Sequence, residues 1–450
     1  MFTSKQIFSI ILPLLLQQFF LIFGGFADTV MVASVGEAAI AGVSLVDQLS
    51  AILTTTMAAL ASGSAVLCAQ SLGRKDIDGA ASYAKQLLLS NLIIALVLML
   101  VLIVFNRSIL NLIFGSIEPE VMDNACKYLV VIAVSIPFFA IDNALAAIFR
   151  AEGNTRISFK ISLITTVIHL VGNAIGIYVL HAGVYGVAIP TLISRIASVA
   201  LYYYAVKHSK GLIKVDFKSD NRLHFGKLKQ IYALGIPMGV ENFMFQFGRT
   251  MLSSLTVSLG TTSVAAYAAS LKICNFAYLP GQAIALAVPA IVGRCIGAGE
   301  FGQAKKNAYR LFGYKYAIML PVVLVISIFA PQIAGWFNLS EAGIGFCTAM
   351  VLVNSAIMPI RPFAFQMGYV LQSASDVRYT MTVSMVSMWI FRVGCAYLFV
   401  NVFHTGVVGI YYGLALDWVV RATLYAWRFF SGKWLRVYQK KQQALETVKN

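Results

Sequence analysis

The strongest constraint on the fold of this chain is an internal repeat that relates its two halves by a nearly constant shift in residue number. Pro13 and Gly36 lie near the two ends of one apolar segment, and Pro237 and Gly260 lie at the corresponding points of a later one, with the same shift for both pairs. A near-constant shift over most of each half indicates two copies of one structural unit. In a membrane chain such a duplication is typical of a transporter whose site lies between the copies. Five further pairs continue the repeat in order: Gly73/Gly297, Ala80/Ala304, Pro137/Pro359, Arg156/Arg378 and Gly183/Gly406.

Composition identifies lipid as the solvent. Of the 450 residues, 59% are hydrophobic and only 12% are charged, which is more apolar surface than a soluble fold can bury. We therefore predict an all-α integral membrane protein with about twelve transmembrane helices in two six-helix repeats. Because six is even, the second copy enters the membrane in the same orientation as the first, so the repeats are parallel. The predicted spans are 8–33, 42–70, 84–105, 121–148, 157–180, 184–206, 229–258, 262–293, 308–330, 343–370, 379–401 and 406–430.

The spans divide the chain into four parts. Residues 1–206 form an N-terminal six-helix bundle, 207–228 a cytoplasmic linker, 229–432 a C-terminal six-helix bundle, and 433–450 a basic cytoplasmic tail. Lys5 precedes an apolar run that is too long for a cleavable signal, so we expect the first span to be retained.

The net charge of +16 indicates the orientation of the chain in the membrane rather than binding to nucleic acid. Cations gather in the loops that follow even-numbered spans, such as Arg74 and Lys75, and in the linker and tail. Under the positive-inside rule both termini are cytoplasmic. We expect a multi-pass protein of a prokaryotic cytoplasmic membrane, monomeric, with no nucleic-acid partner.

No residue pattern in the chain indicates an enzyme or a metalloprotein. The six cysteines are scattered without a CxxC pair, and the five histidines are dispersed. HExxH, GxSxG and phosphate-loop motifs are absent from the sequence. We expect no cofactor other than a coupling ion.

Four segments together resemble the multidrug and toxic compound extrusion (MATE) family. Their order and spacing within a duplicated twelve-span chain are more specific than any one of them. The resemblance implies two six-helix bundles around a central cleft, and export by alternating access, driven by inward H⁺ or Na⁺. Family substrates are commonly amphipathic organic cations. The segments are 26–32 with Gly36 and Ala41, 149–156, 235–237 with Glu241 and Asn242, and 292–299.

The resemblance places an ion-coupling site in the first half. Asp28, about 20 residues into the first span, matches the coupling aspartate of the family. Where the family has an Asn and an acid on the fifth span, this chain has His169 and Asn173. Losing a carboxylate disfavours Na⁺, and histidine titrates near neutral pH, so we favour H⁺ over Na⁺. Thr191 matches a family hydroxyl; a core histidine and a backbone-bonded threonine are the alternative interpretations.

Glu241 is the main candidate for substrate binding in the second half. Its repeat mate is the neutral Gln17, and it precedes Asn242. A carboxylate there would attract an organic cation or a second proton. The alternative is a buried ion pair with Arg249 or Lys272.

The basic residues of the second half are unusual for a pocket that takes cations. Arg361 and Arg392 lie within spans, as do Arg249 and Lys272. Either they pair with Glu241 and backbone carbonyls, or the site accepts an anionic or zwitterionic compound.

Three further features bear on structure. Asp417 and Arg421 are four residues apart and predict a helix ion pair. Asp142 is interpreted as an interhelical hydrogen-bonding group. Pro13 is a candidate hinge, because a proline within a span permits bending.

The leading hypothesis is a secondary antiporter that exports amphipathic organic cations in exchange for inward H⁺. The alternatives are a flippase or exporter of an anionic or lipid-linked substrate on the same fold, an integral-membrane enzyme, and a channel.

Overall fold

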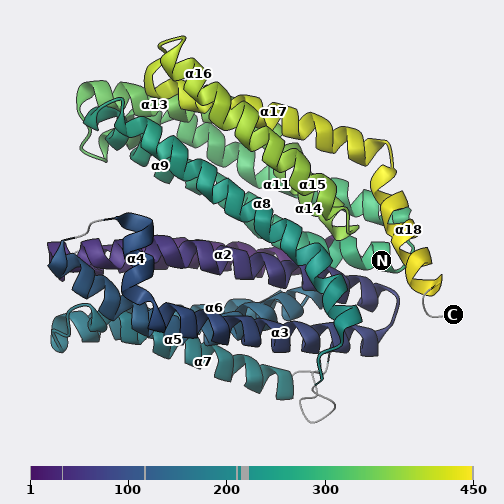
Figure 1. Cartoon of the computed structure of the whole chain (residues 1–450). Coiled ribbons are helices and arrows are strands. Elements are labelled where there is room, and N and C mark those ends of the chain that lie inside the picture. Colours follow the sequence, from purple (N-terminus) through teal and green to yellow (C-terminus); the bar gives the residue numbers. More distant parts are fainter. Residues whose placement is uncertain (1, 33, 116–117, 209–210, 214–221, 448–450) are drawn as a thin grey trace. The chain divides into compact units, whose positions relative to one another are not determined.

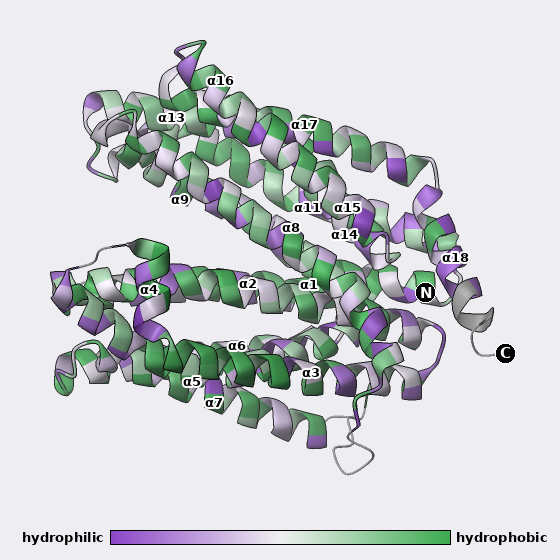
Figure 2. Cartoon of the chain, viewed as in Figure 1, coloured by the Kyte–Doolittle hydropathy of each residue, from purple (hydrophilic) through white to green (hydrophobic). Residues whose placement is uncertain are grey.

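A computed structural model describes residues 2–32, 34–115, 118–208, 211–213 and 222–447 of the chain (Figure 1). These residues are almost entirely helical, and they include no strand. Eleven of their helices are long and apolar enough to cross a membrane. The remaining predicted span, 229–258, corresponds to α8 (Phe225–Val257), a 33-residue helix that carries Glu241 and Arg249. The all-helical membrane fold is therefore confirmed, and Figure 2 shows how hydrophobic residues dominate the long helices.

The first compact unit comprises Ser4–Gly239. Within it, α5 packs against α2, α3 and α7, and α6 packs against α1 and α7. Two clusters of buried aliphatic and aromatic side chains fill the spaces between these helices. The unit contains α1 (Ser4–Val32), α2 (Glu37–Gly73), α3 (Ile77–Val104), α4 (Asn106–Phe114), α5 (Pro119–Ala151), α6 (Thr155–Ala174), the π-helix η1 (Ile175–Val179), α7 (Tyr185–His208) and the first part of α8.

The second compact unit comprises Val240–Asn450 together with Met1–Thr3. Its core lies between α9, α11, α13 and α17, with Trp418 and Tyr411 buried at the centre. After α8, its elements are α9 (Thr261–Val288), η2 (Pro289–Gly293), α10 (Arg294–Gly297), α11 (Phe301–Ile328), α12 (Ala330–Gly335), α13 (Glu341–Ile357), η3 (Met358–Ile360), η4 (Pro362–Gln366), α14 (Met367–Ser373), α15 (Val377–Val386), η5 (Ser387–Gly394), α16 (Cys395–Asn401), η6 (Gly406–Val408), α17 (Gly409–Phe430) and α18 (Lys433–Thr447).

The element boundaries reproduce the sequence repeat. Helices α3 and α11 begin at matching positions of the two copies, Ile77 and Phe301, and they also end at matching positions, Val104 and Ile328. The turns match in backbone conformation as well, because a left-handed φ recurs at corresponding positions of the two halves. The matched pairs are Gly36 (126°) and Gly260 (91°), Lys75 (62°) and Gly299 (77°), Gly153 (77°) and Ser375 (64°), and Gly183 (56°) and Gly406 (62°).

The predicted linker, 207–228, falls partly outside the described residues. Its described ends are tied to the first unit. The backbone N–H of Ile213 donates to the Glu152 carboxylate at 2.5 Å, and the amide of Gln86 donates to the carbonyl of Arg222 at 2.9 Å. Gln86 also accepts from the His224 N–H at 3.0 Å, so one glutamine side chain holds the chain just before α8 begins.

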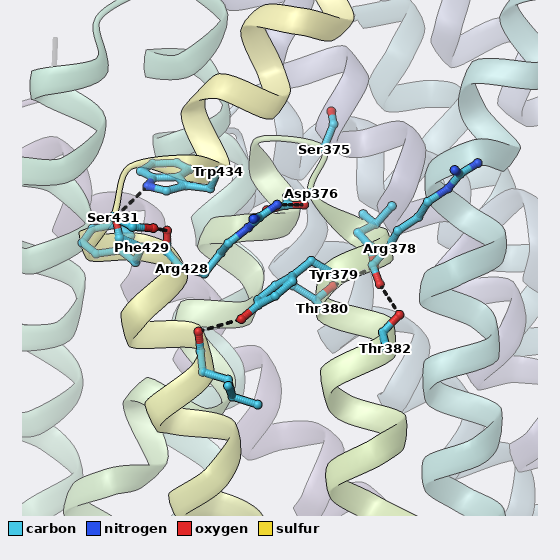
Figure 3. A network of polar contacts seen from close by, with 12 residues as sticks. Ser375, Asp376, Arg378, Tyr379, Thr380, Thr382, Arg428, Phe429, Ser431 and Trp434 are labelled. Atoms are coloured by element: carbon cyan, nitrogen blue, oxygen red, sulfur yellow. Dashed lines mark hydrogen bonds and ion pairs between the residues drawn. The ribbon is translucent and has the colours of Figure 1, made fainter.

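The predicted tail, 433–450, is helical as far as Thr447 and docks on its own unit (Figure 3). Trp434 is fully buried, and its indole N–H donates to the carbonyl of Phe429 at 3.1 Å. Beside it, Arg428 forms an ion pair with Asp376 at 2.8 Å. Lys441 donates to the carbonyl of Ser375 at 2.6 Å. These contacts fix α18 to the turn between α14 and α15.

Candidate functional site

Three helices of the first unit bring the predicted ion-coupling residues together. Asn173 on α6 donates from Nδ2 to Oδ1 of Asp28 on α1 at 2.5 Å. His169 lies one turn before Asn173, and its Nε2 is 3.4 Å from the same amide nitrogen. Residues four apart share a helix face, which explains why these two α6 side chains lie beside each other.

Thr191 on α7 completes this cluster. Its hydroxyl donates to the carbonyl of Val187 at 3.0 Å, and its oxygen is 3.0 Å from Nε2 of His169. The Thr191 oxygen accepts from Nε2 in the tautomer that carries the imidazole proton on Nε2, whereas in the other tautomer Nε2 accepts from the Asn173 amide. Thr191 is therefore both backbone-bonded and part of the cluster.

The cluster offers one carboxylate and a largely enclosed environment. Asn173 is fully buried, and within the described part of the chain its Oδ1 has no hydrogen-bond partner. Asp28 is half-buried. Such a carboxylate, faced by an amide that can present either N–H or C=O, is suited to binding and releasing a proton.

A second acid of the first unit, Asp47 on α2, lies within electrostatic range of Asp28. The phenol of Tyr128 on α5 donates to Oδ1 of Asp47 at 3.2 Å, and the charges of Asp28 and Arg195 both act on this carboxylate. Arg195 donates to the Ser135 hydroxyl at 2.5 Å. Sequence reasoning missed Tyr128 and Arg195; Arg195 could have been noticed as an ionisable residue inside a span.

Asp142 has the structural role predicted for it. The hydroxyl of Ser198 on α7 donates to this carboxylate on α5, so the contact joins two helices.

Glu241 has different partners from those that the ion-pair alternative proposed. Its carboxylate accepts from Nε2 of Gln372 at 3.3 Å, and Ser384 and the charge of Arg421 also act on it. The alternative, an ion pair with Arg249 or Lys272, is not observed, because neither cation forms an ion pair among the described residues. Arg249 instead donates to Gln246, one turn earlier on α8, at 3.4 Å.

The remaining predicted substrate residues are divided between the two units. Gln17 belongs to the first unit, where its Oε1 is buried without a hydrogen-bond partner in the described chain. Asn242 is exposed on α8 of the second unit. Pro13 lies inside α1, which continues unbroken from Ser4 to Val32. The structure shows no break at the predicted hinge.

Asp417 and Arg421 form the predicted helix ion pair at 2.8 Å, and the structure adds a third member. Arg392 of η5 lies 2.8 Å from the other carboxylate oxygen, and the Ser387 hydroxyl also donates to Asp417. All three charged residues are buried. One acid thus compensates two arginines.

Arg361 is the predicted substrate residue whose surroundings differ most from an ordinary ion pair. Its guanidinium carbon lies 4.0 Å from the ring centre of Tyr278, 4.9 Å from Phe365 and 5.5 Å from Trp418. Close to it is Lys315 of α11, which sequence reasoning missed. The available signal was a lysine within the apolar stretch 308–330.

Comparisons with known proteins give a consistent result. The MatE family profile matches residues 13–175 and 237–398, the two copies of the repeat. The chain is 23% identical over 435 residues to the uncharacterized transporter YisQ of Bacillus subtilis, covering 96% of this chain and 95% of that protein. It is 23% identical over 457 residues to the probable multidrug resistance protein NorM of Thermotoga maritima, covering 96% and 93%. A crystal structure of MATE in the bent conformation superposes with a TM-score of 0.89 at 20% identity, over 97% of this chain and 96% of that one.

Proposed function

This chain belongs to the MatE family of multidrug and toxic compound transporters, and we propose that it is an antiporter that exports amphipathic organic compounds in exchange for inward H⁺. The observation that carries the proposal is the hydrogen bond from Asn173 to Asp28, which joins α6 to a carboxylate on α1. Among the described residues of the first unit, this contact gives a membrane-depth acid a defined partner on another helix.

Protonation of Asp28 changes that contact. The ionised carboxylate accepts the N–H of Asn173, whereas a protonated carboxyl carries a proton that it can donate. The Asn173 carbonyl, which has no partner among the described residues, can accept a hydrogen bond from the protonated carboxyl if the amide turns over. The two states of Asp28 therefore favour two arrangements of α1 against α6, and Pro13 gives α1 a place to bend.

The donor set favours H⁺ over Na⁺. Hard cations bind oxygen ligands, preferably several and preferably charged. Here Asp28 supplies the only carboxylate in its cluster with Asn173, His169 and Thr191, and the Asn173 nitrogen faces it. A histidine beside the carboxylate adds a second group that can bind and release a proton.

Amphipathic organic cations are the first substrate class to test, with Glu241 as the attracting carboxylate. We also propose that the protein acts as a monomer in a prokaryotic cytoplasmic membrane, with both termini cytoplasmic. The basic loops after even-numbered spans support this orientation.

The test is ethidium efflux from sealed vesicles that contain the purified protein, with the pH gradient and the Na⁺ gradient collapsed separately. We expect efflux to stop when the pH gradient is removed and to continue when only the Na⁺ gradient is removed. Dependence on Na⁺ alone would overturn the coupling proposal. No ethidium efflux under either gradient would move the substrate assignment to anionic compounds.

A further inference from the structure

Two cationic side chains of the second unit converge on one glycine. Lys315 of α11 is 1% exposed, and Arg361, between η3 and η4, is 7% exposed. A Cβ atom added to Gly281 of α9 would lie 3.2 Å from Nζ of Lys315 and 3.0 Å from Nη1 of Arg361. The ammonium and the guanidinium therefore lie beside the same backbone position, and a side chain at Gly281 would displace one or both.

Within the described part of the chain, no carboxylate compensates this pair. Neither Lys315 nor Arg361 forms an ion pair there, and Nε of Arg361 is buried without a hydrogen-bond partner. The buried acid Asp417 is already held by Arg392 and Arg421.

The energetic cost of this arrangement falls mainly on Lys315. Arg361 is stabilised by cation–π contacts with the faces of Tyr278, Phe365 and Trp418. No aromatic ring lies over Lys315 in the same way among the described residues. A buried ion without a counter-ion is unfavourable, and a second like charge near the same glycine adds repulsion. An anion between them would remove both costs.

The repeat shows that this positive charge is specific to the second half. The positions that match Lys315, Arg361 and Gly281 in the first half are Asn91, Phe139 and Met57, all of them uncharged. The second half therefore has two cationic side chains and a glycine where the first half has an asparagine, a phenylalanine and a methionine.

We propose that Lys315 and Arg361 bind one anionic group of carboxylate size beside Gly281, and that the exported compounds include some that carry such a group. A guanidinium pairs well with the two oxygens of a carboxylate, and an ammonium adds a compact positive charge. The part of this inference that concerns export rests on the transporter function proposed above. A zwitterionic compound offers a positive group to Glu241 and a negative group to Lys315 and Arg361. Zwitterions are therefore the substrate class that matches the charges of the second unit best.

The test is equilibrium binding to the purified full-length protein in detergent, without any ion gradient. Three naphthalene compounds of similar size serve as probes: the anion 1-naphthoate, the cation 1-naphthylmethylammonium and the neutral 1-naphthylmethanol. We expect 1-naphthoate to bind at least about tenfold more tightly than the neutral alcohol, which corresponds to about 1.4 kcal/mol. Lys315→Met should abolish that preference without weakening binding of the alcohol.

Lys272→Met is the matched control, because it makes the same change at an exposed lysine of α9 in the same unit. It should leave the preference for 1-naphthoate unchanged. If Lys315→Met does not fold, Arg361→Gln replaces it, and 1-naphthoate should raise the thermal unfolding temperature of the wild type but not of this variant. Equal binding of all three probes, or loss of the preference in the control as well, would overturn the proposal.

A final experiment distinguishes a site for a substrate carboxylate from a site for an inorganic anion. Binding is measured in a chloride-free zwitterionic buffer and repeated with added chloride, and 1-naphthoate export is measured in vesicles under a pH gradient. Export that is lost in Lys315→Met supports the proposal. Displacement of 1-naphthoate by chloride, with ethidium but not 1-naphthoate exported, would overturn its substrate part. Binding that persists without any gradient-driven transport would contradict the antiporter function and leave the anion site standing.

Discussion

Asn173 on α6 donates a hydrogen bond at 2.5 Å to Asp28 on α1, a residue far from it in the sequence. The contact links the helix that carries the acid to the helix that carries His169 on the same face as Asn173. A proton on Asp28 removes the negative charge that this amide binds. We propose that this loss of negative charge on Asp28 couples proton binding to transport, and substitutions at Asp28 and Asn173 test it.

Replacing Asp28 by Asn should lower the rate of gradient-driven export at least about tenfold without preventing folding. The substitution is nearly isosteric, but its amide cannot exchange a proton at physiological pH. Export is measured in vesicles, and folding is measured by purified yield and thermal unfolding. Asp142→Asn is the control, because Asp142 is also a carboxylate bound by a neutral side chain from a neighbouring helix. Full export by Asp28→Asn would remove Asp28 from the mechanism.

Replacing Asn173 by Asp should move the coupling preference toward Na⁺. The change places a second carboxylate beside Asp28, where this chain has an amide. Two acids at hydrogen-bond distance form a better site for a hard cation. The measurement is ethidium efflux with the Na⁺ gradient as the only driving force. Efflux of the variant that remains indifferent to Na⁺ would show that this position does not select the ion.

Apolar runs and the internal repeat were sufficient to predict the helical membrane fold. They predicted the spans because a helix needs about 20 predominantly apolar residues to cross a bilayer. The pair Asp417–Arg421 was likewise predictable, because residues four apart meet on any helix. The grouping of Asp28 with Asn173 came from the family resemblance, since nothing local relates two positions on helices so distant in the sequence.

The cation pair of the second half could not be predicted in this way. Lys315 and Arg361 meet only because α9, α11 and the η3–η4 segment pack together around Gly281. Arg392 joins Asp417 for a similar reason: it lies on the π-helix η5, whose side-chain directions do not follow the spacing of an α-helix. Sequence spacing fixes neighbours within one regular helix, whereas these contacts depend on packing between elements.

Replacing Glu241 by Gln should weaken export of ethidium more than it lowers protein abundance. The carboxylate accepts from Gln372 at 3.3 Å, and a glutamine side chain can keep a hydrogen bond there without the charge. The informative measurement is the initial rate of efflux divided by the amount of protein in the vesicles. Glu300→Gln, at an exposed position before α11, is the control for charge alone. Unchanged export would leave Glu241 with a structural role only.

Replacing Asp417 by Asn should destabilise the second unit strongly. Asp417 is fully buried and holds both Arg392 and Arg421 at 2.8 Å, so removing its charge leaves two buried guanidinium groups without an anion. Breaking a buried ion pair from one side costs about 3–5 kcal/mol. The measurement is thermal unfolding of the purified protein in detergent. Asp123→Asn is the matched control, because Asp123 pairs with Lys127 at 2.5 Å on an exposed face, and exposed pairs contribute about 0–1 kcal/mol. Equal effects of the two substitutions would mean that the arginines of the second unit find other compensation, and that the shortage of negative charge around Arg361 is less severe than its contacts indicate.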